Sequence, residues 1–339
     1  MDFSHCPSSN RMEHSTERKK FLNTMRALSA LPFARLNNSY WEANMDFQPK
    51  GIIPAMVTPV TSDGKINVEA LRKLTNYLIK GGVHGLFPIG SQGEFYALTF
   101  EEKKRVIEVV IEETRGRVPV YAGTGAITTR EAVALTQMAE AVGASAVSVI
   151  TPFFIRPNES ELLEFYTAIA KVTRLPVLLY NNPARTGVNI SADFVVRASK
   201  VENIVGIKDS SGDLTLTAEY IRRTNEKFSV LAGRDTLIYG TLCYGGRGAI
   251  AATANVAPKV IVEIYEAFQA GDWKRSLEAQ FRLAPLRLAF DLGTFPVVIK
   301  EALNLIGIDA GIGIPPVGGI SPKAQEELKE ILKNLELLK

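Results

Sequence analysis

The chain has 339 residues, of which 46% are apolar and 22% are charged, and its formal net charge is +3 at neutral pH. This length and composition are typical of a globular protein with either one large α/β barrel or two smaller domains. The small net charge and the scattered basic residues argue against a nucleic-acid partner, and no apolar run is long enough to span a membrane.

Cysteine and histidine are too scarce in the main body of the chain for several common kinds of site. Of the two cysteines and three histidines, only Cys243 and His84 lie beyond the first fourteen residues. We therefore expect no metal site built from these residue types and no Ser-His-Asp triad. Nothing resembles a disulfide framework, which favours a reducing compartment and predicts a cytoplasmic location.

Residues 1–45 differ from the rest of the chain, because they mix basic residues with Ser and Asn and show no strand alternation. A transit peptide is one explanation, but four acidic residues in this segment count against it, and no continuous apolar region suggests secretion. We expect a disordered N-terminal extension or the product of an upstream start codon, and we assign it no chemistry.

From Gly51 onward, short apolar runs alternate with amphipathic stretches of helical period. The predicted strands are Ile52–Val57, Gly85–Ile89, Val118–Ala122, Ala146–Ile150, Val177–Tyr180, Ile204–Ile207, Ser229–Leu231 and Ala249–Ala252. The helices that follow them are predicted at Val68–Lys80, Thr99–Thr114, Arg130–Ala141, Ser160–Val172, Ala192–Ser199, Leu214–Arg223, Thr236–Tyr244 and Pro258–Ala270. Eight such pairs predict an α/β protein with a (β/α)8 TIM barrel over residues 46–270, since open doubly wound sheets usually have fewer strands.

Three further helices are predicted after the eighth pair, and they make residues 271–339 a C-terminal helical region packed on the barrel. Their predicted bounds are Trp273–Ala289, Pro296–Leu305 and Pro322–Leu338. The last of them has a serine, Ser321, as its expected N-cap and a proline at its first helical position.

Lys208 is placed where the predicted sixth strand ends and the turn residues Asp209 to Gly212 begin. In a parallel α/β barrel the carboxyl end of each strand faces the active site. A lysine amine there can attack a carbonyl group and form a Schiff base. The alternative is that Lys208 is an ordinary cation where a strand meets water, and the local sequence would be the same in both cases.

Two other predicted strands end in residues suited to a keto acid. After the second strand, Gly90 and Gly93 flank Ser91 and Gln92, so that backbone and side-chain donors can face a carboxylate. After the fifth strand, Tyr180 can relay protons and Arg185 can hold a carboxylate through two hydrogen bonds. A tight turn, a capping aromatic and a solvated arginine are the alternative readings of these positions. Together with Lys208, however, they predict a site for an α-keto acid.

In these motifs, the chain from Gly51 onward resembles the dihydrodipicolinate synthase/N-acetylneuraminate lyase family of class I, pyruvate-dependent aldolases. The resemblance rests on the order and spacing of the segments Gly90–Glu94, Tyr180–Pro183, Arg185–Gly187, Gly206–Asp209 and Gly248–Ile250. It implies a TIM barrel, no metal or organic cofactor, a small 2-oxo acid as substrate, and a homotetramer arranged as a dimer of dimers.

The resemblance also implies roles for individual residues. Lys208 would form the Schiff base, Tyr180 would relay protons, and Ser91 would belong with Gln92 to the loop that binds the substrate carboxylate. The remaining residues that the resemblance assigns to the substrate pocket are Arg185, Ser210, Gly233, Asp235 and Ile250. Asp235 falls where the sialic acid lyases use an acid to hold substrate hydroxyls.

The sequence departs from the lysine-pathway synthases of that family at a few positions. Those enzymes have a relay tyrosine after the fourth strand, whereas this chain has Phe153 and Phe154, and Gln92 stands where they have a second threonine. Arg185 is synthase-like, but the segment from Thr294 to Glu301 looks more like enzymes that cleave 2-keto-3-deoxy sugar acids.

These departures favour a lyase or aldolase that cleaves a 2-keto-3-deoxy sugar acid or a 4-hydroxy-2-oxo acid and releases pyruvate. The first alternative is 4-hydroxy-tetrahydrodipicolinate synthase, which condenses pyruvate with aspartate semialdehyde in lysine biosynthesis. A dehydratase using the same imine is a close variant of the first function. A second alternative is a non-catalytic barrel that binds keto acids, since a fold alone does not decide function.

Overall fold

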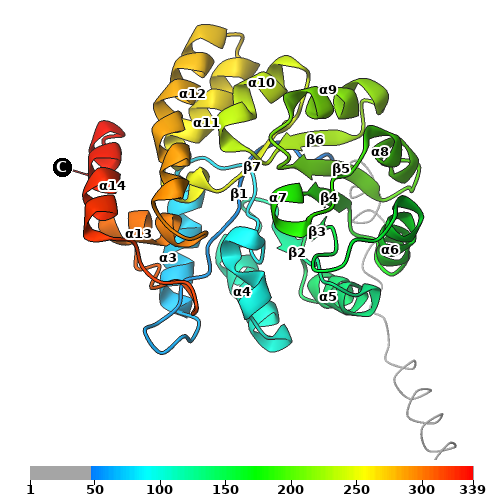
Figure 1. The fold of residues 1–339 in the computed structure, drawn as a ribbon, viewed down its shortest axis with the longest axis horizontal. Helices are drawn as coiled ribbons and strands as arrows, with labels where there is room; N and C mark the ends of the chain where they lie inside the picture. The colour runs from blue at the N-terminus through cyan, green and yellow to red at the C-terminus, as the bar shows by residue number, and fades with distance from the viewer. Residues whose placement is uncertain (1–46, 339) are drawn as a thin grey trace, which may run out of the picture. The chain divides into compact units, whose positions relative to one another are not determined.

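The computed structural model describes residues 47–338, so the predictions for residues 1–45 lie outside the described part of the chain. Within residues 47–338, seven parallel strands form one sheet in the order β1-β7-β6-β5-β4-β3-β2. Their bounds are β1 Gly51–Pro54, β2 Tyr121–Gly123, β3 Ala146–Ile150, β4 Val177–Asn181, β5 Ile204–Asp209, β6 Ser229–Ala232 and β7 Gly248–Ala251. Figure 1 shows these strands at the centre of a ring of helices.

The segment predicted as the second strand, Gly85–Ile89, is not a continuous strand, but it closes the barrel between β1 and β2. Phe87 bridges to Ala55 beside β1, and Leu86 bridges to Val120 beside β2. The segment stops pairing early because Pro88 has no N–H to donate and Ile89 has a φ of 59°, in the left-handed region. The predicted (β/α)8 architecture is therefore confirmed, with one strand reduced to two bridges.

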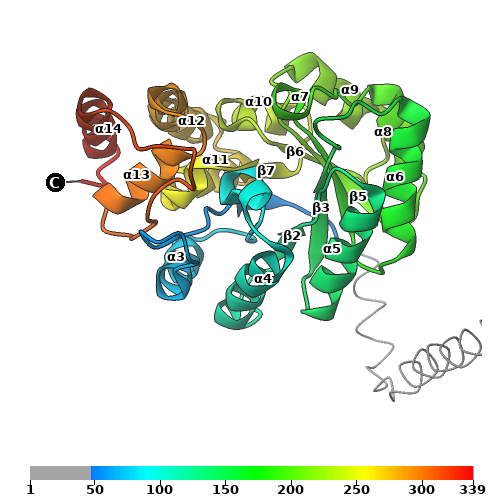
Figure 2. The same ribbon diagram turned by 60° about the horizontal axis from the view of Figure 1, so that its bottom comes forward.

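The eleven predicted helices are present, with ends shifted by one or two residues in several cases and by four at the end of the last, and residues 47–338 also contain a short helix that was not predicted, α7. Their bounds are α3 Val68–Lys80, α4 Phe100–Thr114, α5 Thr129–Ala141, α6 Glu159–Lys171, α7 Pro183–Thr186, α8 Ala192–Ala198, α9 Leu214–Arg223, α10 Ile238–Cys243, α11 Pro258–Gln269, α12 Trp273–Leu288, α13 Val297–Leu305 and α14 Pro322–Asn334. A capping box of Thr99 and Glu102 opens α4, and Ser321 caps α14 as predicted. Figures 1 and 2 both show α12, α13 and α14 together at the α11 side of the barrel.

Two apolar layers account for the packing. Inside the barrel, eight buried residues from the strands form a small cluster that includes Ile53, Phe87, Leu178, Leu231 and Ile250. A much larger cluster fills the space between the strands and the surrounding helices. The strands are thus buried on both faces, as continuous apolar runs in a parallel sheet require.

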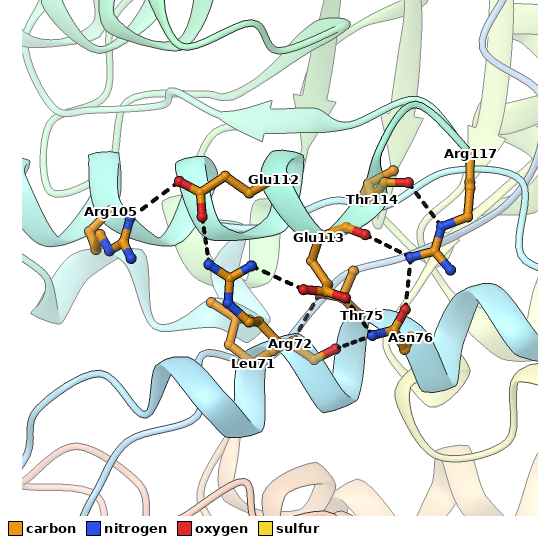
Figure 3. Close-up of polar contacts among 9 residues, drawn as sticks. All are labelled: Leu71, Arg72, Thr75, Asn76, Arg105, Glu112, Glu113, Thr114 and Arg117. Atoms are coloured by element: carbon orange, nitrogen blue, oxygen red, sulfur yellow. Dashed lines mark hydrogen bonds and ion pairs between the residues drawn. The ribbon is translucent and has the colours of Figure 1, made fainter.

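A polar network joins α3 to α4, the two helices on either side of the irregular second strand (Figure 3). Arg72 on α3 forms ion pairs with Glu112 and Glu113 on α4, and its Nη1 lies 3.0 Å from Glu113 Oε2. Asn76 donates to Glu113 over 2.7 Å and accepts from Arg117 over 2.7 Å. These contacts tie the two helices together on the outside of the irregular second strand.

The C-terminal helices are joined to the barrel by a buried ion pair between Lys300 on α13 and Glu94. Both side chains are 0% exposed. Lys300 Nζ donates to Ile312 O over 2.7 Å, and Glu94 Oε1 accepts from Ile314 N over 2.8 Å. Burial lowers the pKa of Lys300, and Glu94 partly offsets that shift. The pair therefore needs both partners to remain charged in the interior.

We expect Lys300→Met to destabilise the fold by about 3 to 5 kcal/mol, because it leaves the Glu94 carboxylate buried without its cation. The double variant Lys300→Met/Glu94→Leu should recover most of this loss, since it removes both charges. Urea unfolding of the wild type, both single variants and the double variant measures the effect. Equal destabilisation in the single and double variants would contradict a coupled ion pair.

Candidate functional site

A cavity of about 420 Å³ lies at the carboxyl ends of the strands, and all nine residues predicted for the site line it. They come from five different segments of the barrel rim. These residues are Ser91, Gln92, Tyr180, Arg185, Lys208, Ser210, Gly233, Asp235 and Ile250. Parallel strands bring residues far apart in sequence to one rim, so the predicted residues are adjacent in space.

Lys208 and Tyr180 face each other because they are paired in register on β5 and β4. Lys208 Nζ lies 4.1 Å from the centroid of the Tyr180 ring and 5.1 Å from that of Phe87. Both Lys208 and Tyr180 are 4% exposed. The amine therefore sits at the base of the cavity against two aromatic faces, where little water surrounds it.

The Tyr180 hydroxyl is prepared for proton transfer by its neighbours. Burial raises its pKa, but the charge of Lys208 and the polar side chains of Ser91, Asn182 and Ser210 outweigh burial, so that the net pKa lies below its usual value. Asn182 Nδ2 donates to the Tyr180 hydroxyl over 2.9 Å. A phenol of lowered pKa next to an amine gives up its proton more readily than an ordinary tyrosine, which suits it to proton transfer.

The end of β5 is fixed by Asp209, the residue that follows Lys208 and is 3% exposed. Asp209 Oδ2 accepts from the Thr217 hydroxyl on α9 over 2.6 Å. Its Oδ1 accepts from Asn181 Nδ2 on β4 over 3.1 Å and from the backbone N–H of Ser211 over 3.0 Å. These bonds hold the backbone of Lys208 against the neighbouring strand and the following helix.

The loop with Ser91 and Gln92 forms a short 3-10 helix, Ser91–Gly93, at the base of the cavity. Gln92 Nε2 donates to Pro296 O over 3.1 Å. Within residues 47–338, neither Ser91 Oγ nor Gln92 Oε1 has a hydrogen-bond partner, although both are buried. A buried polar atom without a partner costs about 1 to 3 kcal/mol, so both atoms favour a polar ligand in the cavity.

The opposite wall is formed by Ser210, Gly233, Asp235 and Ile250. A Cβ atom on Gly233 would lie 2.1 Å from Ser210 Oγ, so only glycine fits there. Asp235 Oδ2 accepts from both the backbone N–H and the hydroxyl of Thr253, each over 2.7 Å, which leaves its other oxygen available to a ligand. Ile250 is fully buried on β7 and forms part of the apolar base.

Several cavity residues were not predicted from the sequence. Asn182 and Phe87 adjoin predicted motifs, but their contacts with Tyr180 and Lys208 depend on how the strands pair. Arg234, Arg287 and the stretch Phe290–Phe295 also line the cavity. Arg287 belongs to α12, outside the strand ends, so a search restricted to strand ends could not identify it.

Two further observations concern only residues 47–338. No three His, Cys, Asp or Glu side chains in this range are placed together in a way that could hold a metal ion. No helix in the same range is both long enough and apolar enough to cross a membrane.

Comparison with known sequences gives consistent matches across this part of the chain. The model of the Dihydrodipicolinate synthetase family matches residues 48–335. A 4-hydroxy-tetrahydrodipicolinate synthase from Methanopyrus kandleri is 40% identical over 296 residues, which cover 87% of this chain and 99% of the relative. The enzyme of the same name from Phenylobacterium zucineum is 39% identical over 289 residues, which cover 85% of this chain and 98% of that relative.

Solved structures agree with the sequence matches. The dihydrodipicolinate synthase from Thermotoga maritima has a TM-score of 0.84 and 32% identity, and the match covers 86% of this chain and all of that chain. A second match is YagE, a prophage protein of the dihydrodipicolinic acid synthase family from E. coli K12 that was solved in complex with pyruvate. It has a TM-score of 0.82 and 35% identity, and the match covers 85% of this chain and 99% of that chain.

The Tyr180 hydroxyl is expected to titrate at higher pH once Lys208 loses its charge. In Lys208→Met the buried environment stays and the nearby cation is gone, so the pKa of Tyr180 should rise. Ultraviolet pH titration, with the spectrum of Tyr180→Phe subtracted, isolates this phenol from the other tyrosines. Lys171→Met on α6 controls for the loss of one positive charge, and an unchanged titration in Lys208→Met would refute the coupling.

Proposed function

The chain belongs to the Dihydrodipicolinate synthetase family, and we propose that it condenses pyruvate with aspartate semialdehyde through a Schiff base on Lys208. This is the first alternative raised by the sequence, and the names of the relatives favour it over the cleavage reaction. The chain is a lyase of the class I aldolase type. The observation that carries the proposal is the buried Lys208 amine paired with Tyr180 in one cavity.

The proposed chemistry begins when the neutral amine of Lys208 attacks the keto carbon of pyruvate and water leaves. The imine then withdraws electrons while the adjacent methyl group loses a proton, which gives an enamine. The enamine carbon attacks the aldehyde carbon and forms the new C–C bond. Tyr180 would carry protons during these steps, and the Ser91 hydroxyl would donate to the pyruvate carboxylate together with backbone groups of its loop.

Arg185 supports a second substrate that carries a carboxylate. Its guanidinium lies over the Phe295 ring, 4.5 Å from the ring centroid, at the wall of the cavity. A guanidinium that contacts a ring with one face can still form two parallel hydrogen bonds to a carboxylate through its N–H groups. Aspartate semialdehyde has such a group at the end remote from its aldehyde.

Cleavage of a hydroxylated 2-oxo acid is the second candidate, and the pair Phe153–Phe154 favours it. Phe153 packs against Phe95 with 5.6 Å between ring centroids, and Phe154 is 93% exposed with a φ of 72°. Neither ring can donate a proton, so a relay through this loop is absent. The lysine-pathway synthases of the family have a relay tyrosine in this loop, so its absence favours cleavage to pyruvate, which proceeds through the same imine with Tyr180 as the proton carrier.

The oligomeric state and cellular location remain predictions: a homotetramer in the cytoplasm. The non-catalytic barrel raised from the sequence is not supported, because the chain is a lyase of the aldolase type.

Borohydride reduction in the presence of pyruvate is expected to add one covalent adduct per chain, on Lys208. The adduct forms because reduction traps the imine as a stable amine. Peptide mass mapping identifies the modified residue, and Lys208→Arg should show neither adduct nor turnover while keeping its melting temperature. An unmodified Lys208 at saturating pyruvate would refute the Schiff-base mechanism.

The two candidate reactions are expected to differ in kcat/KM by about 10³ or more on one enzyme preparation, because a site built to bond a given group rejects substrates without it. The proposal predicts that condensation with aspartate semialdehyde is faster than cleavage of 2-keto-3-deoxy acids without a distal carboxylate. 4-Hydroxy-2-oxoglutarate carries that carboxylate, so its cleavage tests the reaction type separately from the arginine. Arg185→Ala should harm only substrates with a distal carboxylate. Efficient cleavage without condensation would replace the synthase with the aldolase.

A further inference from the structure

Three arginines line the same cavity. Arg185 follows β4, Arg234 follows β6, and Arg287 lies in the last turn of α12. Within residues 47–338 none of the three forms an ion pair. Several other arginines of the described chain also lack an ion pair, but these three are distinguished by lining one cavity together.

The placement of Arg287 has an energetic cost that a bound anion would offset. Burial lowers its pKa, and Arg234 and Arg185 lower it further, while Asp235 and Asp291 act in the opposite direction. The Arg287 guanidinium lies 4.3 Å from the centroid of the Phe290 ring, which holds its plane in place. A partly buried cation next to two others is unfavourable unless an anion binds between them.

The acidic residues of the cavity, Asp235 foremost, offset only part of this charge. Four cationic and two acidic side chains line it, which gives a net charge of +2. One oxygen of Asp235 is already bonded to Thr253, and Asp291 is exposed. The excess positive charge is on the more exposed side of the cavity, because Arg185 and Arg234 are exposed whereas Lys208 is buried.

We propose that Arg234 and Arg287 form, together with Arg185, an anion subsite that binds the charged end of the second substrate. Arg287 is the specificity-determining residue of this subsite, because it is the most buried of the three arginines. The ligand class is an aldehyde that carries an oxyanion, either a carboxylate or a phosphate, on the end remote from the reacting carbon. The assignment to the second substrate rests on the proposed function, whereas anion binding itself does not.

The test measures anion binding directly on the pyruvate-loaded enzyme, with inorganic phosphate and acetate as separate probes in calorimetric titrations. Arg287→Gln and Arg234→Gln should each weaken binding by about 10- to 100-fold, as expected for the loss of a charge-assisted hydrogen bond. Arg275→Gln is the matched control, since Arg275 lies on the same helix and pairs with Glu263 away from the cavity. The affinity of this control variant for phosphate and for acetate should stay within about twofold of the wild-type value.

Steady-state kinetics provides the second readout. Arg287→Gln should raise the KM for the aldehyde and leave the KM for pyruvate and the borohydride adduct unchanged, which a general loss of structure would not do. Tighter binding of phosphate than acetate identifies a phosphorylated second substrate, and comparable binding identifies a carboxylate. Wild-type affinity for both probes in Arg287→Gln and Arg234→Gln would overturn the subsite. Weakened anion binding in an enzyme that does not turn over aspartate semialdehyde would keep the subsite and refute the proposed reaction.

Discussion

The buried ion pair between Glu94 and Lys300 is the constraint on which the geometry of the site depends. Glu94 has a φ of 54° and is fully buried directly after the Ser91–Gly93 turn, so its carboxylate sets where that turn lies. Lys300 belongs to α13, and the Gln92 amide bonds to Pro296 just before that helix. The loop is thus held from outside the barrel. The C-terminal helices therefore complete the site as well as cover the barrel.

A second constraint is the register of the parallel strands. Because Tyr180 on β4 is opposite Lys208 on β5, a shift of the pairing would separate the phenol from the amine. Burial alone would make this phenol a weaker acid than usual, as it does for Tyr121 and Tyr166. At Tyr180 the lysine charge and the neighbouring polar groups reverse that direction. Reactivity at this position is therefore a property of the pair and its surroundings.

The sequence was sufficient to predict the barrel and the residues at its strand ends, because the periodicity of apolar residues and the positions of turn residues are local signals. The sequence did not predict features that depend on contacts between distant segments of the chain. The second strand looked apolar enough to be regular, but Pro88 and Ile89 end its pairing after two bridges. Gln92 was predicted as a carboxylate donor, yet its amide nitrogen bonds to Pro296 and its oxygen is the atom left free. Arg287 had no local signal, since only the packing of α12 brings it to the cavity.

The division between base and mouth of the cavity suggests how one barrel can serve related reactions. At the base, Lys208, Tyr180 and the Ser91 loop are buried and held by bonds to neighbouring elements, so they can support imine chemistry whatever the second substrate is. At the mouth, Arg185 and Arg234 are exposed, and Phe154 projects into solvent. Exposed side chains can change without disturbing the packed core. Substitutions among the exposed cations at the rim can therefore change substrate choice while the imine chemistry at the base stays the same.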